Sequence, residues 1–103
     1  MKRDPLEVIQ EALIQEELLC QLAEEAAELA QAALKLRRAY DGTNPTPVTS
    51  REAYEGLLEE IADVNVCIMA LELDRGFNFV QVSRIVNEKL ERWAGRLLGG
   101  INH

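Results

Sequence analysis

The chain has 103 residues, of which 48% are hydrophobic and 28% are charged, a balance typical of one small globular domain rather than a disordered segment. Eighteen acidic and 11 basic residues give a net charge of −7, which argues against a general nucleic-acid binder. A small anionic substrate is still compatible with this charge, because a bound divalent cation can reverse the field inside one pocket.

Several other classes of protein are disfavoured by the sequence. It has no continuous apolar stretch of about 18 residues and no apolar signal region at its start, so we expect no membrane partner and a cytoplasmic location. The only histidine is His103, which argues against a histidine-dependent triad or a histidine-rich zinc site. Cys20 and Cys67 lack CxxC spacing, and both are predicted to be buried, reduced thiols.

The first part of the chain is predicted to form two helices. Residues 6–40 contain no proline or glycine and are rich in Ala, Leu, Glu and Gln, which favour helix. Because this stretch is too long for one helix in so small a domain, we expect helices over about residues 6–14 and 16–40. Residues 41–50, DGTNPTPVTS, are dense in turn-forming residues and are predicted to be the inter-helix loop.

Two further helices are predicted in the second part. The third begins at about residue 51, with Ser50 or Thr49 as its cap, and runs to about residue 74 before Gly76. The fourth is capped by Asn78 and runs to about residue 98, ending at two glycines, residues 99–100.

These elements predict an all-α fold, an antiparallel helical bundle of about four helices that forms one domain over residues 1–103. The third helix is apolar on more than one face, which one short chain can hardly cover. We therefore expect the bundle to be completed by oligomerisation, as a dimer or a tetramer, with this helix near the interface.

Charged residues inside the third helix suggest a site. Residues 59–73, EEIADVNVCIMALEL, are nearly all apolar after the first two, yet they include Asp63. A carboxylate in such surroundings is costly unless it is paired or binds a cation.

Two helices carry matching acidic pairs, Glu25 with Glu28 and Glu60 with Asp63. Each pair is spaced i, i+3 and so shares one helical face, which lets four carboxylates converge if the helices pack antiparallel. Like charges gathered in this way need a compensating cation. Oxygen ligands without histidine favour Mg2+, with Mn2+ as a possible substitute, over a di-iron site. The alternative interpretation is that each pair belongs to a solvated helix face.

The motifs EEAAE (residues 24–28) and EEIAD (residues 59–63) resemble the EExxE and EExxD motifs of the MazG-like all-α nucleoside triphosphate pyrophosphohydrolases. The resemblance covers residues 18–97. It implies a Mg2+-dependent enzyme that cleaves a nucleoside triphosphate to the monophosphate and pyrophosphate, and that works as a dimer or tetramer. It also implies that Glu25, Glu28, Glu60 and Asp63 are the metal ligands.

Basic residues are expected to bind the phosphates of such a substrate. By the resemblance these are Lys89 and Arg92, with Arg96 one turn on, and the three positions share one helical face. Lys35, seven residues after Glu28 and on the same face, is a further candidate.

Glu24 and Glu59 are candidates for a catalytic role, as bases toward the attacking water or as supports for the metal ligands. Two alternative functions stay open. One is a non-enzymatic helical interaction module whose acidic face binds a basic partner. The other keeps the metal site but hydrolyses a phosphoribosyl nucleotide.

Overall fold

The computed structural model describes residues 2–45, 47–72 and 77–101. Within these residues all regular structure is helical and no strand occurs, so the all-α prediction and the expected number of helices are confirmed. None of the described helices combines the length and apolar character needed to cross a lipid bilayer. The helices are α1 (Pro5–Ala12), α2 (Gln15–Asp41), α3 (Ser50–Glu72) and α4 (Phe79–Ile101).

Two predicted side-chain caps fix where the later helices begin. The Thr49 hydroxyl accepts a hydrogen bond from the Glu52 N–H (3.1 Å) before α3. The Asn78 side-chain carbonyl accepts one from the Gln81 N–H (3.0 Å) before α4. Each cap satisfies an amide that the first turn of a helix leaves without a backbone partner.

The turn after α2 depends on a left-handed glycine. Gly42 has φ 75° and donates its N–H to the Arg38 carbonyl, which ends the helix. The Asn44 side chain then donates to the Lys35 carbonyl and accepts from the Arg38 Nε, both at 3.1 Å. These bonds hold the following loop against the end of α2.

The predicted helix limits lie close to the observed ones except at the end of the chain. We expected the glycines at residues 99–100 to end the last helix, and this is wrong, because α4 continues to Ile101. A glycine ends a helix when it adopts a positive φ, and Gly42 is the only described residue that does so. The expected stop at Gly76 lies outside the described residues.

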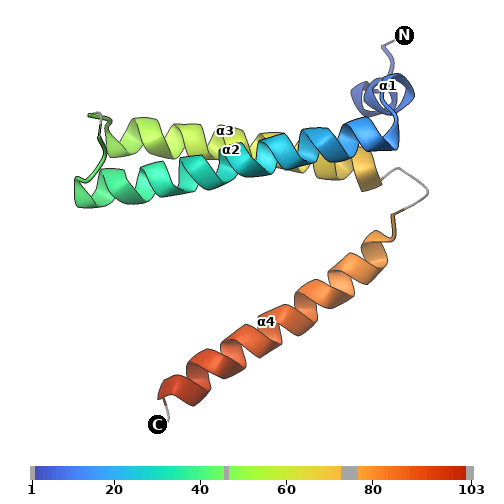
Figure 1. Ribbon diagram of the computed structural model, residues 1–103. Helices are drawn as coiled ribbons and strands as arrows, with labels where there is room; N and C mark the ends of the chain where they lie inside the picture. Colours follow the sequence, from blue (N-terminus) through green and yellow to red (C-terminus); the bar gives the residue numbers. More distant parts are fainter. Residues whose placement is uncertain (1, 46, 73–76, 102–103) are drawn as a thin grey trace.

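Helices α2 and α3 run antiparallel and lie side by side along their length (Figure 1). Two of the buried positions between them, Ala53 and Ala70, are small and let the helices approach closely. At one end, Leu18, Ala70 and Leu71 form a core that α1 covers and that Phe77 and Phe79 also contact. We call this helix pair the α2–α3 hairpin.

Helix α4 stands apart from the α2–α3 hairpin beyond its first turn (Figure 1). The radius of gyration is 18.0 Å, whereas a compact domain of this length has about 13 Å. The accessible surface is 8333 Å2, about 2,500 Å2 more than a compact folded monomer of this mass exposes. A single chain therefore leaves much of its apolar surface uncovered.

The two cysteines differ in their surroundings. Cys67 is buried in α3, as predicted, but Cys20 is exposed on α2, so the prediction that both are buried is wrong. Residue 20 lies on a side of α2 that α3 does not cover.

We expect Gly42→Ala to lower the free energy of unfolding by about 1 kcal/mol, because a Cβ is strained at this positive φ although no atom lies within 4 Å of it. Gly95→Ala is the matched control. It also meets open space but lies inside α4, and it should stabilise that helix by up to about 1 kcal/mol. Urea denaturation at fixed protein concentration measures the free energy of unfolding of both variants. Equal effects of the two substitutions would contradict the requirement for glycine at residue 42.

Candidate metal centre and adjoining groove

A cluster of carboxylates lies where the middle of α2 faces the middle of α3. One oxygen each from Glu25, Glu60 and Asp63 lie within 4.8 Å of one another. Glu60 and Asp63 are one turn apart on α3, and the antiparallel packing brings Glu25 of α2 to the same point. Three of the four predicted metal ligands therefore converge as the sequence indicated.

Two oxygens of this cluster receive no hydrogen bond from an N–H or hydroxyl group in the part of the chain that the structure describes. The Gln21 side chain donates to Oε1 of Glu25 at 2.9 Å. Oε2 of Glu25 and Oε2 of Glu60 are both buried, and neither accepts a hydrogen bond from an N–H or hydroxyl donor among the described residues; the carboxyl of Glu28 lies close enough to share a proton with either glutamate. Buried polar atoms are normally satisfied, so these two oxygens are available to a cation.

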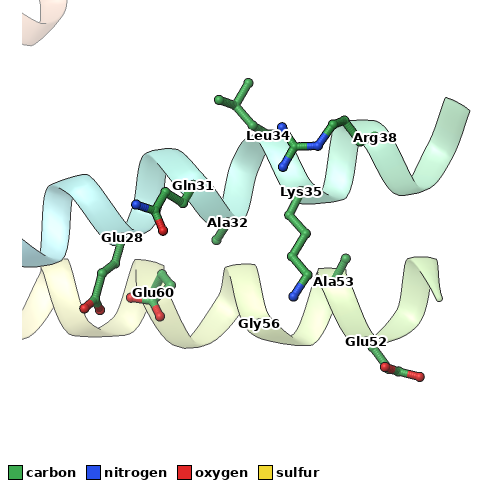
Figure 2. A pocket seen from close by; sticks show the side chains of 10 residues that line it. All are labelled: Glu28, Gln31, Ala32, Leu34, Lys35, Arg38, Glu52, Ala53, Gly56 and Glu60. Atoms are coloured by element: carbon green, nitrogen blue, oxygen red, sulfur yellow. The ribbon is translucent and has the colours of Figure 1, made fainter. Parts of the chain in front are cut away.

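Glu28, the fourth predicted ligand, adjoins the cluster without belonging to the tight group of three. Its carboxylate interacts with those of Glu25 and Glu60. Figure 2 shows Glu28 and Glu60 extending beside each other from the two helices. A small change of the Glu28 side chain would bring it to an ion held by the other three.

Burial and like charges raise the pKa values of two members of this cluster, Glu25 and Glu60. Burial raises the pKa of Glu25 above its ordinary value of 4.5, and the charges of Glu28 and Asp63 raise it further against the opposing hydrogen bond from Gln21. The pKa of Glu60 is raised by burial and then by the same two neighbours. A positive charge placed beside Glu25 and Glu60 would lower both pKa values again.

The residues present fit a hard divalent cation. All the candidate ligands are oxygens, which Mg2+ and Mn2+ prefer. Three oxygens that lie within 4.8 Å of one another could be brought to one small cation by movement of their side chains alone.

A groove of about 720 Å3 runs from the carboxylates along the α2–α3 hairpin toward the loop. Glu28 and Glu60 lie at one end of it, and Lys35 and Arg38 lie farther along α2 (Figure 2). Lys35 extends across the groove toward α3, where Gly56 has no side chain to meet it. The groove thus offers carboxylates at one end and a cation beyond them.

The other predicted site residues lie outside this arrangement. Glu24 and Glu59 are exposed, so the structure gives no support to a catalytic role for either. Lys89, Arg92 and Arg96 are exposed on α4, which extends away from the α2–α3 hairpin (Figure 1). Their phosphate-binding role stays a prediction, as does that of Lys35.

Three polar residues that line the groove were not predicted as site residues from the sequence: Gln31, Arg38 and Glu52. Gln31 and Arg38 could have been found, because with Glu28 and Lys35 they follow the spacing i, i+3, i+7, i+10 along one side of α2. No comparable signal marks Glu52, which reaches the groove through the pairing of the two helices.

Comparison of the chain with protein-family models, with curated proteins and with solved structures gave no match. The likeness to the MazG-like family therefore rests on the two acidic motifs and on the convergence of their side chains.

We expect Mg2+ to stabilise the protein near pH 7.5 and much less near pH 5. The raised pKa values mean that the folded state holds more protons than the unfolded chain from about pH 4.5 upward, so metal-free stability falls as pH rises through this window. Mg2+ should reverse this loss, because it replaces the protons. Thermal denaturation at both pH values, with and without Mg2+, measures the effect.

Glu60→Gln is the matched variant for that experiment. It removes one repelling charge, so it should melt higher than the unsubstituted protein without metal at pH 7.5 and should gain less from Mg2+. If Mg2+ raised the melting temperature of the variant and of the unsubstituted protein equally, Glu60 would not be a ligand of the ion.

Proposed function

We propose that this protein is a Mg2+-dependent nucleoside triphosphate pyrophosphohydrolase that releases pyrophosphate and a nucleoside monophosphate. The observation that carries the proposal is the pair of buried oxygens on Glu25 and Glu60, beside Asp63, that receive no hydrogen bond from an N–H or hydroxyl group among the described residues. The two acidic motifs that resemble the MazG-like family supply these residues. The class of substrate in this proposal is non-standard nucleoside triphosphates that must be removed from the cell.

In this proposal Glu25, Glu60 and Asp63 hold the ion, and Glu28 joins them from the groove side. Bound Mg2+ supplies positive charge to phosphate oxygens and acidifies a coordinated water. The Gln21 amide fixes the orientation of Glu25 by donating to its other oxygen. The protein's task is thus to keep several carboxylates ionised and aligned at one point.

The groove supports a substrate that extends beyond the ion. The ammonium of Lys35 lies within reach of an anionic group whose other end meets the carboxylate cluster. A triphosphate needs such cations in addition to the metal, because its charge exceeds that of one divalent ion. Self-association as a dimer or tetramer belongs to the same proposal and accords with the apolar surface that one chain exposes.

The direct test is a screen for pyrophosphate release over standard and modified nucleoside triphosphates, with and without Mg2+. Glu60→Gln and Asp63→Asn should each lower kcat/KM by about 100-fold or more, because each removes a metal ligand. Glu91→Gln is the matched control on α4, where residue 91 is exposed, and it should leave activity unchanged.

The same screen separates the alternatives. Mg2+ binding without pyrophosphate release from any nucleoside triphosphate would redirect the search to phosphoribosyl nucleotides. Neither Mg2+ binding nor hydrolysis would leave the helical interaction module as the remaining interpretation.

We expect Lys35→Met to raise KM for a nucleoside triphosphate by about tenfold, because it removes a charged contact while keeping the length of the side chain. Steady-state kinetics measure this against Arg37→Met, which removes an exposed charge from the same helix outside the groove. Equal kinetics for the two variants would exclude Lys35 from substrate binding.

A further inference from the structure

Helix α4 exposes an apolar stripe with no partner surface among the described residues of its own chain. The side chains of the stripe are between 45% and 61% exposed, and at about 100° per residue they fall within an arc of about 80°. We call these residues the α4 stripe: Val82, Val86, Leu90, Trp93 and Leu97.

Helix α3 exposes a second stripe with the same spacing. Its members follow i, i+4, i+8, i+11, as do the first four residues of the α4 stripe, and they cover an arc of similar width. Its second member is an alanine, which lets another helix approach closely. We call these residues the α3 stripe: Leu58, Ala62, Val66 and Met69.

Opposite charges border the two stripes. Asp63 of the metal cluster and Glu59 follow the α3 stripe on one flank. Three basic side chains border the α4 stripe: Lys89, Arg92 and Arg96. When both helices are viewed from their N-termini, the acidic residues lie on one side of the α3 stripe and these basic residues lie on the other side of the α4 stripe. When two helices pack face to face, opposite flanks meet only if the helices run parallel, as the e and g positions do in a parallel coiled coil.

This parallel pairing cannot form within one chain. Phe79, at the start of α4, packs on the core that contains Ala70 and Leu71, near the end of α3. For a parallel match α4 would have to begin near Leu58, about 18 Å earlier along the α3 axis. Folding α4 back over its own α3 gives the antiparallel orientation, which turns the basic flank away from Asp63.

We infer that a second copy of the chain lays its α4 stripe on the α3 stripe in parallel orientation and so brings its Lys89, Arg92 and Arg96 to the metal cluster. The surface in excess of a compact monomer, about 2,500 Å2, is well above the roughly 800 Å2 per partner of a standard interface. The inference rests on the proposed function for the role of the basic residues, and it makes each site a product of two chains. A lone chain has the carboxylates without these cations.

Mixing two inactive variants tests the shared site. Asp63→Asn removes a carboxylate, and Arg92→Ala combined with Lys89→Ala removes two cations. If the chains share the site, an equal mixture refolded together should recover about a quarter of wild-type activity, because about one site in four receives both intact halves. If each site belongs to one chain, the mixture should be no more active than the average of its components, which would overturn the inference.

Cross-linking tests the pairing without any reference to activity. In a background that carries Cys20→Ser, one preparation carries Ala62→Cys and the other carries Val86→Cys. Residues 62 and 86 hold the second place in their stripes, so mild air oxidation of the mixture should produce disulfide-linked dimers. Each preparation oxidised alone should give few.

The remaining outcomes are also decisive. Dimers from Ala62→Cys alone, or an intramolecular bond in a chain that carries both substitutions, would overturn the parallel pairing between copies. An inactive wild-type protein that still cross-links as described would refute the proposed hydrolase function while leaving the pairing intact.

Discussion

The close packing of α2 against α3 is the interaction on which the rest of the molecule depends. Ala53 and Ala70 keep the two helix axes close, and this closeness forces Glu25 of one helix against Glu60 and Asp63 of the other. The apolar contacts must outweigh the repulsion among these carboxylates, since no cationic side chain pairs with them among the described residues. The α2–α3 hairpin therefore stores electrostatic strain that a bound cation can relieve.

Much of the arrangement follows from this one pairing. Helix α1 and Phe77 with Phe79 close one end of the hairpin, while Asn44 ties the loop at the other end. The side of α3 that faces away from α2 exposes apolar residues, and so does one side of α4. The repulsion among the carboxylates and the exposed apolar surface are separate costs to stability. A bound divalent ion would offset the first, and a second copy of the chain would cover the second.

The four helices and the convergence of the acidic side chains could be predicted from the sequence. Thr49, Asn78 and the turn residues of the loop mark helix ends by local chemistry, and the i, i+3 pairs place carboxylates on facing helices without knowledge of the packing. The direction of α4 could not be predicted, because it is set by how Phe79 meets a core built from distant residues. Glu52 was missed for the same reason, and Cys20 was misplaced because local hydrophobicity does not tell which sides of a helix find a partner.

The buried thiol of Cys67 bears on which ion the cluster can hold. Burial raises the pKa of this thiol, and the nearby charges of Glu25 and Asp63 raise it further. Sulfur binds metals as the thiolate, and both effects disfavour that form at this position. The carboxylates thus favour the neutral form of their sulfur neighbour, so oxygens are the charged groups that the cluster presents.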